Sequence, residues 1–301
     1  MARKRELLIL VIIAVGLVAA FIFLPHNPKT PTVYYEPDDG RFVPTFPKDD
    51  FDYSTTGWSA TIVRYTGLGS DIVIPDKLGG YPVTAIDKAA FANCHTITNV
   101  VIPESVTSIA SGAFQNCTSL TSINIPENVT VIDNNVFYGC TSLASITLPN
   151  TVTIIGNAAF YKCPFTEITI PSGVTAIEKF AFCGCAALTS VVIPNGITKI
   201  DNSAFQDCTA LTSINIPKNV TSIGDWAFAN CTALDGVVIP VGVTSIGKYA
   251  FFACSSLTSI NIPDNVVSVG EYAFFDCELL GRVDIPDSVT DIGDFAFGDE
   301  Y

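Results

Sequence analysis

The sequence predicts a repeat solenoid of about ten coils, each about 23 residues long, and three observations predict it. The segment IPKNVTSIGDWAFANCTALDGVV, residues 216–238, is followed directly by a close variant that begins at Ile239. A phenylalanine recurs at the same point of every copy. An Ile-Pro pair, in one copy Leu-Pro, recurs with its proline at Pro75, Pro103, Pro126, Pro149, Pro171, Pro194, Pro217, Pro240, Pro263 and Pro286. A period of this length lies within the range of leucine-rich repeats.

Each copy contains three short elements. The stretch LTSINIP, residues 211–217, is predicted to be a short strand that ends at a proline, because proline cannot donate a hydrogen bond to a sheet. The following VTSIG predicts a second short extended piece. The AFxxC segment, residues 227–231, is predicted to form one short helical turn whose phenylalanine fills the coil. No coil can cover its own apolar side alone, so the coils are expected to stack with parallel strands about 4.8 Å apart.

Stacking turns each repeat position into a line of side chains. The phenylalanines are therefore expected to form one buried column, made of Phe91, Phe114, Phe137, Phe160, Phe182, Phe205, Phe228, Phe251, Phe274 and Phe297. Each buried ring contributes about 1.5–3 kcal/mol. This column is expected to be a main source of stability.

The N-terminus predicts a membrane segment, residues 1–24. Eighteen apolar residues, 7–24, follow Arg3, Lys4 and Arg5, and as a helix they span about 27 Å. The basic residues are expected to stay in the cytoplasm, with the rest of the chain displayed at the cell surface. The alternative is a signal peptide cleaved after small residues 18–20, which gives a secreted protein. The apolar run continues through residues 21–24, which favours a retained anchor.

The solenoid is expected to occupy residues 53–301, behind a proline-rich acidic spacer at residues 25–52. Its first unit, residues 53–95, is predicted to be an N-terminal cap. The last copy stops at AFGDEY, before its own cysteine and strand. Open strand edges at this end are expected to fray or to pair end to end with another copy.

Composition weighs against two function classes. The net charge is −14, so the chain would repel phosphate backbones and nucleic acid is not an expected partner. Only two histidines are present, and no nucleophile elbow, phosphate loop or zinc-ligand spacing occurs. No catalytic, cofactor-binding or metal-binding residues are therefore expected. His95 is expected to lie in a surface turn.

The repeat pattern IPxxVTxIGxxAFxxCxxLTSI resembles the BspA-type leucine-rich repeat family, and the opening YSTTGWSATIVRYTGLGSDIVIPDKLGGYPVTAI resembles the usual first unit of that family. The resemblance covers residues 53–301. It implies a bacterial surface or secreted protein, because members of this family are mostly of that kind. Several members are linked to adhesion to host matrix proteins or other cells, so the resemblance also implies a partner outside the cell.

Nine of the ten cysteines occupy one repeat position: Cys94, Cys117, Cys140, Cys163, Cys185, Cys208, Cys231, Cys254 and Cys277. Neighbours in this column would have Cβ atoms near the 4.8 Å strand spacing, wider than the roughly 3.8 Å of a disulfide. They are expected to be free thiols that fill the core as small apolar groups. Cys183 is the extra cysteine, and two interpretations remain: an exposed reactive thiol or an incidental substitution.

One surface column is asymmetric along the chain. The residue just before Ala-Phe is small or polar in the early copies but aromatic in most later ones, at Phe180, Trp226, Tyr249, Tyr272 and Phe295. Phe252 and Phe275 add rings on the adjacent turn. Two interpretations remain: the rings form a contact surface for a protein or glycan, or they pack against one another between coils. A weaker candidate surface is the face of small, uncharged Ser, Asn, Thr and Val residues along the main strands.

The function predicted from the sequence is a non-enzymatic binding or adhesion module, displayed outside the cell, that contacts a protein or glycan through its repeat faces. The alternative is a structural spacer or envelope scaffold without a specific ligand. The two differ in whether replacing Trp226, Tyr249 and Tyr272 by serine abolishes binding.

Overall fold

The structure, a computed structural model, describes residues 32–35, 42–45 and 50–298, and the chain divides into two compact units, Met1–Lys48 and Asp49–Tyr301. In the first unit, β1 (Thr32–Tyr35) pairs antiparallel with β2 (Phe42–Thr45). The predicted membrane segment, residues 1–24, lies outside the described residues. Among the described residues, none belongs to a helix with the length and apolarity needed to cross a bilayer.

The second unit begins with a cap that closes the solenoid core. Its sheet contains β3 (Phe51–Thr55), β4 (Ala60–Tyr65), β7 (Tyr81–Ile86) and β6 (Lys77–Leu78), in that order. The buried rings of Phe51 and Tyr65 extend the phenylalanine column, since Tyr65 stacks on Phe91 with ring centroids 5.4 Å apart. Phe51 therefore belongs to the solenoid unit, which begins a few residues before the predicted boundary at residue 53.

The main strands lie side by side in successive coils, and all of the pairs between them are parallel. Their bounds are β5 (Asp71–Val73), β8 (Asn99–Val101), β10 (Ser122–Ile123), β13 (Glu167–Thr169), β15 (Ser190–Val192), β17 (Ser213–Ile214), β19 (Gly236–Val238) and β21 (Ser259–Asn261). They form three short sheets, in the orders β10-β8-β5, β13-β15 and β17-β19-β21.

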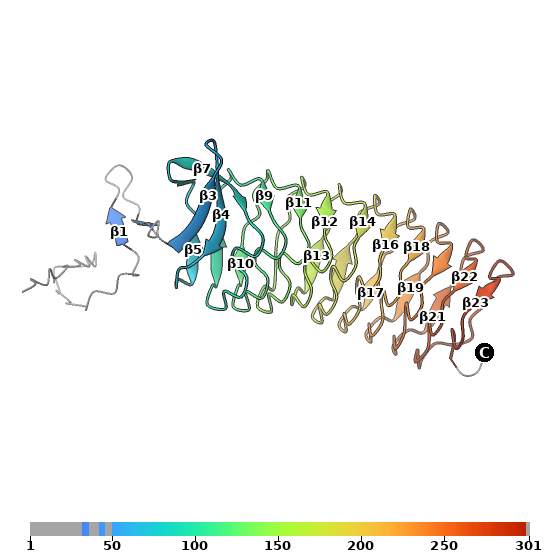
Figure 1. The fold of residues 1–301 in the computed structure, drawn as a ribbon. Coiled ribbons are helices and arrows are strands. Elements are labelled where there is room, and N and C mark those ends of the chain that lie inside the picture. Colours follow the sequence, from blue (N-terminus) through green and yellow to red (C-terminus); the bar gives the residue numbers. More distant parts are fainter. Residues whose placement is uncertain (1–31, 36–41, 46–49, 299–301) are drawn as a thin grey trace, which may run out of the picture. The chain divides into compact units, whose positions relative to one another are not determined.

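A second column of two-residue strands runs along the other side of the coils (Figure 1). Its bounds are β9 (Ser108–Ile109), β11 (Val131–Ile132), β12 (Ile154–Ile155), β14 (Ala176–Ile177), β16 (Lys199–Ile200), β18 (Ser222–Ile223), β20 (Ser245–Ile246), β22 (Ser268–Val269) and β23 (Asp291–Ile292). Strands β14, β16, β18, β20, β22 and β23 form one sheet in that order. Ser222 pairs with Ser245 and Ile223 with Ile246, one repeat further along. Pairing of the outer edge of β23 with another copy stays a prediction.

The predicted helical turn at AFxxC is wrong. This segment is a run of hydrogen-bonded turns: the N–H of Ala227 donates to the carbonyl of Gly224, and that of Ala229 to the carbonyl of Trp226. Trp226 and Asn230 have φ of 60°. A left-handed residue every four positions interrupts a right-handed helix. The N–H groups of alternate residues instead donate to the next coil, as Phe228 does to Ala250 at 2.7 Å.

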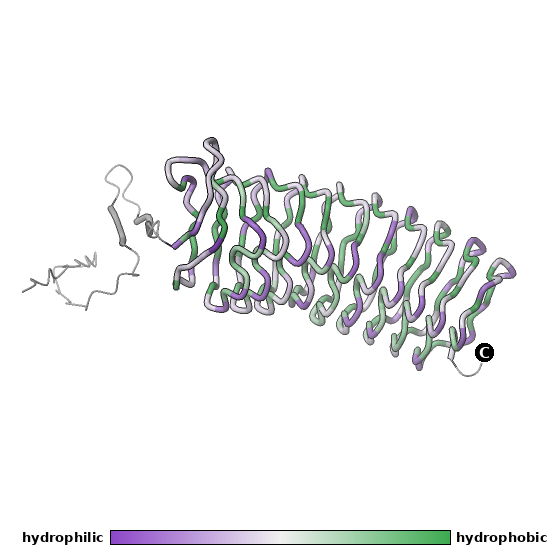
Figure 2. Tube along the Cα trace, in the orientation of Figure 1, coloured by the Kyte–Doolittle hydropathy of each residue, from purple (hydrophilic) through white to green (hydrophobic). Residues whose placement is uncertain are grey.

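The phenylalanine column is buried and stacked as predicted. Phe137 and Phe160 have ring centroids 5.6 Å apart and planes 4° apart, and the stacking continues to Phe297. Apolar and polar positions recur from coil to coil along the chain (Figure 2). Each coil thus adds one ring to a continuous core.

All ten cysteines are free, and all but Cys94 are buried. Each thiol from Cys117 onward in the column donates to the carbonyl of a column phenylalanine, at Sγ to O distances of 3.1–3.3 Å. Burial raises the pKa of every thiol in this column, for Cys140 and Cys277 to about 12. The cysteines therefore link coils as neutral hydrogen-bond donors, which adds to their predicted role as small fillers.

Candidate functional site

The residue before Ala-Phe, or before Val-Phe in one copy, has a left-handed backbone in every repeat, and we call this position the left-handed slot. Its φ values lie between 51° and 66°. The slot is occupied by Ala89, Gly112, Asn135, Ala158, Phe180, Ser203, Trp226, Tyr249, Tyr272 and Phe295. A residue with a Cβ in this conformation costs about 1–2 kcal/mol. The same backbone forms with glycine, alanine, serine or asparagine in the slot, so the fold does not require an aromatic ring there.

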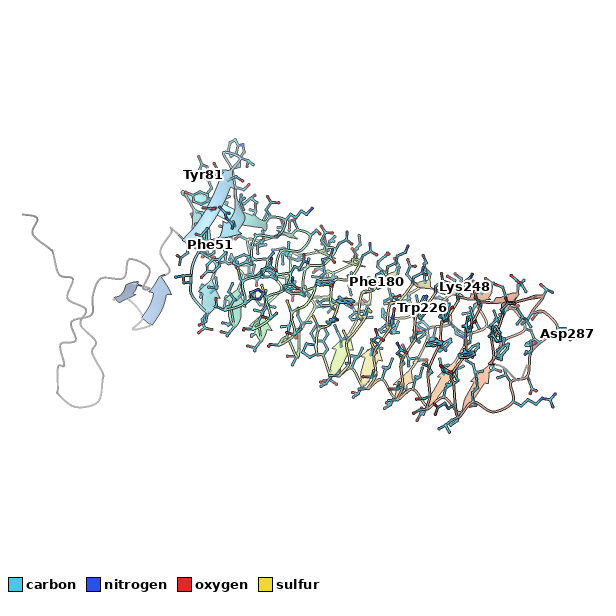
Figure 3. All side chains as sticks on the ribbon, turned by 60° about the horizontal axis from the view of Figure 1, so that its bottom comes forward. Phe51, Tyr81, Phe180, Trp226, Lys248 and Asp287 are labelled. Atoms are coloured by element: carbon cyan, nitrogen blue, oxygen red, sulfur yellow. The ribbon has the colours of Figure 1, made fainter. Side chains whose placement is uncertain are left out.

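Four aromatic residues in consecutive slots form a continuous stack, which we call the aromatic ladder: Trp226, Tyr249, Tyr272 and Phe295. The rings of Trp226 and Tyr249 have centroids 4.0 Å apart and planes 6° apart. The next two steps are 5.0 Å and 5.3 Å. The ladder lies in the C-terminal half of the solenoid, where Figure 3 labels Trp226 and Lys248.

Phe252 and Phe275 form a second aromatic column beside the ladder. Phe252 contacts Tyr249 and Phe275 contacts Tyr272, with the ring planes 63° and 71° apart. The two phenylalanine rings lie parallel to each other, with centroids 6.1 Å apart. One edge of the ladder therefore packs against this column, so the two sequence interpretations are not exclusive: the rings pack on one another and are also partly exposed.

Phe180 does not join the ladder. Phe180 is 42% exposed, and its ring stacks on no other ring in the part of the chain that the structure describes. Ser203, which is 5% exposed, occupies the slot between Phe180 and Trp226. At the other end of the ladder, Phe295 is 49% exposed. Of the seven predicted contact residues, six are thus brought together and Phe180 is left apart.

Glycines permit a close approach of neighbouring coils under the ladder. A Cβ on Gly224 would lie 2.6 Å from the backbone N of Asn202, and one on Gly247 would lie 2.5 Å from that of Asp225. Such contacts are sterically forbidden, so only glycine allows this backbone approach. Most other copies carry an acidic residue or alanine at this position, but Gly156 makes the same close approach below a slot that holds Ala158. The close approach therefore accompanies the ladder but does not require it.

Acidic residues border the ladder. Asp225, Glu271 and Asp294 each immediately precede a ladder ring in the chain, and they line a shallow pocket of about 510 Å³ beside β20, β22 and β23. Lys248 occupies the same position in the remaining coil, and its Nζ lies 3.2 Å from a Glu271 carboxylate oxygen. Desolvation and the nearby Glu271 carboxylate raise the pKa of Tyr249. Its hydroxyl therefore stays protonated, and it can donate a hydrogen bond at neutral pH.

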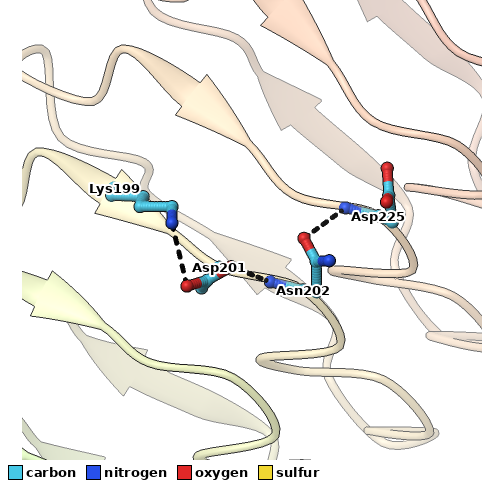
Figure 4. A network of polar contacts seen from close by, with 4 residues as sticks. All are labelled: Lys199, Asp201, Asn202 and Asp225. Atoms are coloured by element: carbon cyan, nitrogen blue, oxygen red, sulfur yellow. Dashed lines mark hydrogen bonds and ion pairs between the residues drawn. The ribbon is translucent and has the colours of Figure 1, made fainter.

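A network of polar contacts links the turns of two neighbouring coils just before the left-handed slots (Figure 4). The N–H of Asp225 donates to Oδ1 of Asn202 at 3.0 Å, one coil earlier. Asp201 is buried and accepts from Lys199 Nζ at 2.9 Å and from the N–H of Asn202 at 2.7 Å. Burial raises the pKa of Asp201, but these two hydrogen bonds outweigh it, and the net pKa is lowered. Asp201 is therefore charged and engaged within the fold.

The polar strand faces are largely used for contacts between coils. Threonine hydroxyls donate to the carbonyl one coil earlier, as Thr221 does to Thr198 at 3.2 Å. The side chain of Asn124 pairs with both backbone polar groups of Ile102. Val238 is an apolar residue on this face and is 72% exposed. The ladder is therefore the stronger candidate surface.

A second, partly exposed ring pair was not predicted from the sequence. Tyr138 and Tyr161 stack with centroids 4.6 Å apart, in the position that Phe252 and Phe275 occupy later. Lys162 Nζ lies 5.3 Å from the centre of the Tyr161 ring. The recurrence of tyrosine at neighbouring copies was the available signal. This pair has no aromatic neighbours in the left-handed slot, so it is an isolated stack.

The remaining chemical candidates do not form a site. His95 lies in a turn with Nδ1 3.2 Å from the Thr118 hydroxyl. Cys183 is buried, which raises the pKa of its thiol to about 12, so the interpretation as an exposed reactive thiol is wrong. Within residues 50–298 and the two short strands before them, no three His, Cys, Asp or Glu side chains are grouped to hold a metal ion.

Stacked coils of about 23 residues with short parallel strands and a continuous ring core define a solenoid of the leucine-rich-repeat type. A family profile described as BspA type leucine rich repeat region (6 copies) matches residues 68–188 and 175–301. The chain belongs to this family, which confirms the resemblance seen in the sequence.

Solved structures share the fold. A leucine-rich repeat protein from Bacteroides ovatus is 30% identical, with a TM-score of 0.63 over 83% of this chain and 78% of that chain. The pneumococcal vaccine antigen PcpA is 17% identical, with a TM-score of 0.56 over 89% and 79% of the two chains, and this likeness concerns the fold alone. No match is found among curated proteins.

Because the slot residues are strained, replacing a ladder residue should have only a small effect on stability. Replacing Tyr249 by asparagine removes stacking on two rings but also relieves backbone strain, because asparagine tolerates the left-handed conformation. We expect the free energy of unfolding to fall by about 1 kcal/mol, measured by urea titration. A loss of several kcal/mol would show that the ladder is a structural element.

Proposed function

We propose that this protein is a non-enzymatic binding module that contacts an extracellular partner through the aromatic ladder. One observation carries the proposal: the ladder rings occupy a position where five other coils build the same backbone with small or polar residues. The rings are therefore an addition to a fold that forms without them. Aromatic side chains supply a large contact area at low entropic cost, and they dominate the energetics of many interfaces.

The rings occupy an unfavourable conformation, which also supports a role beyond packing. Tyr249 and Tyr272 have φ of 58° and 56°, and bulky residues rarely adopt such values. Strained residues of this kind cluster at binding sites, where the surrounding structure holds them in place. The second aromatic column and the hydrogen bonds of the slot N–H groups to the next coil supply that support.

The proposed location is the outside of a bacterial cell. The basic residues 3–5 and the apolar run at residues 7–24 support export with a retained anchor, and the family is typically found on cell surfaces. A solenoid of linked coils is rigid, so its ladder would be presented as one continuous strip. A structural spacer without a ligand is the alternative function.

The test uses an array of purified matrix proteins and immobilised glycans, probed with the full-length chain. The triple variant Trp226→Ser, Tyr249→Ser and Tyr272→Ser places in each slot the residue that Ser203 already provides. We expect the wild type to bind at least one array component and the variant to bind it about 100-fold more weakly, since each truncated anchor removes a kilocalorie or more.

A matched control removes rings elsewhere. The double variant Tyr138→Gln and Tyr161→Gln deletes the isolated stack and installs the residue found at Gln115 and Gln206. This variant should bind like the wild type. Binding that is indifferent to the triple variant, or no binding to any component, would favour the spacer function instead.

A further inference from the structure

We propose that the aromatic ladder binds a protein segment that carries lysine or arginine side chains, rather than a glycan. This inference rests on the proposed function, and it names the chemistry of the partner. It follows from which parts of the rings remain accessible and from the charges that surround them.

The ring faces of the ladder are covered by one another. Trp226 and Tyr249 lie 4.0 Å apart and almost parallel, and Tyr249 and Tyr272 lie 5.0 Å apart with planes 11° apart. A sugar ring packs its C–H groups against the electron-rich face of an aromatic ring. Tyr249 and Tyr272 have ring neighbours on both faces, and the slot before Trp226 holds the covered Ser203. The ladder therefore does not offer the row of open faces that a glycan chain would need.

The ladder offers ring edges and tyrosine hydroxyls instead. Its inner edges contact Phe252 and Phe275, which leaves the opposite edges for a partner. The edge of an aromatic ring is electropositive and favours carbonyl oxygen atoms. The protonated Tyr249 hydroxyl is a hydrogen-bond donor for the same kind of acceptor. A polypeptide backbone supplies carbonyl oxygens at regular spacing.

The charges beside the ladder select basic side chains. Asp225, Glu271 and Asp294 each precede a ladder ring in the chain and line one shallow pocket, and Lys248, the one cation at these four positions, is paired with Glu271. The row therefore keeps a net negative charge. The whole chain also carries a charge of −14, so the long-range field acts in the same direction. Complementary charge sets partner choice and association rate.

The experiment uses a full-length Trp58→Phe variant, in which Trp226 is the remaining tryptophan. Trp58 is 87% exposed in the turn between β3 and β4, so this change leaves the ladder intact. Trp226 fluorescence is titrated with a short peptide of alternating arginine and threonine, with its glutamate and threonine counterpart, and with maltoheptaose and chitohexaose. We expect the arginine peptide to bind at least about tenfold more tightly than the glutamate peptide, and neither oligosaccharide to change the emission.

Two triple variants, each lacking three negative charges, distinguish recognition at the ladder from the long-range attraction of the peptide to the whole acidic chain. Asp225→Asn, Glu271→Gln and Asp294→Asn should weaken binding of the arginine peptide about fivefold or more. The control changes Glu127→Gln, Asp264→Asn and Asp287→Asn, three exposed acids in the turns after the prolines, and it should weaken binding less than about twofold.

Several results would overturn the inference: no binding of the arginine peptide, equal binding of the glutamate peptide, an equal effect of both neutralised variants, or an oligosaccharide that changes Trp226 emission. The array experiment distinguishes failure of the basic-partner inference from failure of the proposed binding function. A glycan on the array whose binding depends on the ladder would overturn the basic-partner inference, and it would leave the binding function intact.

Discussion

Raising the pH above about 9 is expected to unfold the solenoid under reducing conditions. Nine thiols are buried, and burial raises the pKa of each of them. In the unfolded chain the thiols ionise near their ordinary value of 9.0, whereas in the folded chain they stay protonated. The unfolded state then binds fewer protons, so stability is full below pH 9 and falls as the pH rises.

The expected size is large because the thiols act together. One pH unit above 9, each buried thiol lowers the free energy of unfolding by about 1.4 kcal/mol. Nine of them lower it by about 13 kcal/mol, which is comparable to the whole stability of a domain. Circular dichroism from pH 7 to 10.5, with a reductant present, measures the effect. Replacing Cys140, Cys208 and Cys254 by alanine should reduce the pH dependence by about a third. A protein that keeps its stability at pH 10 would contradict the neutral thiol column.

Replacing Phe182 by alanine is expected to lower the free energy of unfolding by about 3–5 kcal/mol. Its ring is fully buried and stacks on Phe160 and Phe205, with centroids 5.6 Å and 5.4 Å away. The deletion leaves a cavity inside a continuous column, and the neighbouring coils cannot close it without losing their own strand pairing.

Phe180 provides the matched control, because it lies two residues earlier in the same coil and its ring is exposed and unstacked. Replacing Phe180 by alanine should cost less than about 1 kcal/mol, since Ala158 already occupies the same slot one coil earlier. Urea titration of the two variants gives the comparison. Equal effects would contradict a core that is built on the phenylalanine column.

The sequence was sufficient to predict that the coils stack and which residues form the core. A fixed period makes Phe91 and Phe114 equivalent, and equivalent positions must align when the coils stack. The same argument placed Cys117 inside, where it is buried. The family resemblance carried the same information, since the family pattern is the pattern of inward side chains.

The local backbone could not be predicted from the pattern. The AFxxC segment contains alanine, which favours helices, but the left-handed residues at Trp226 and Asn230 divide it into turns. Tryptophan rarely adopts that conformation, so neither its propensity nor its hydropathy signals it. The conformation is held by hydrogen bonds to the next coil, which are tertiary contacts.

The composition of the candidate surface was predicted better than its geometry. The repeat register placed Trp226, Tyr249 and Tyr272 in one column, but it gave no ring orientation. Face-to-face stacking also depends on the side-chain torsion angles and on the contacts with Phe252 and Phe275, which the repeat pattern does not specify. Phe180 belonged to the same column by sequence, but Ser203 separates it from the other rings.

Hydroxyl-radical footprinting tests the central claim most directly, because it reports the exposure of each aromatic side chain with and without an array partner bound. We predict that binding lowers the oxidation of Trp226, Tyr249, Tyr272 and Phe295, while Trp58, which is 87% exposed in the cap, is oxidised as before. Unchanged oxidation of the four ladder rings, with protection of Trp58 or of Val238 on the main strand face, would contradict the ladder as the recognition surface.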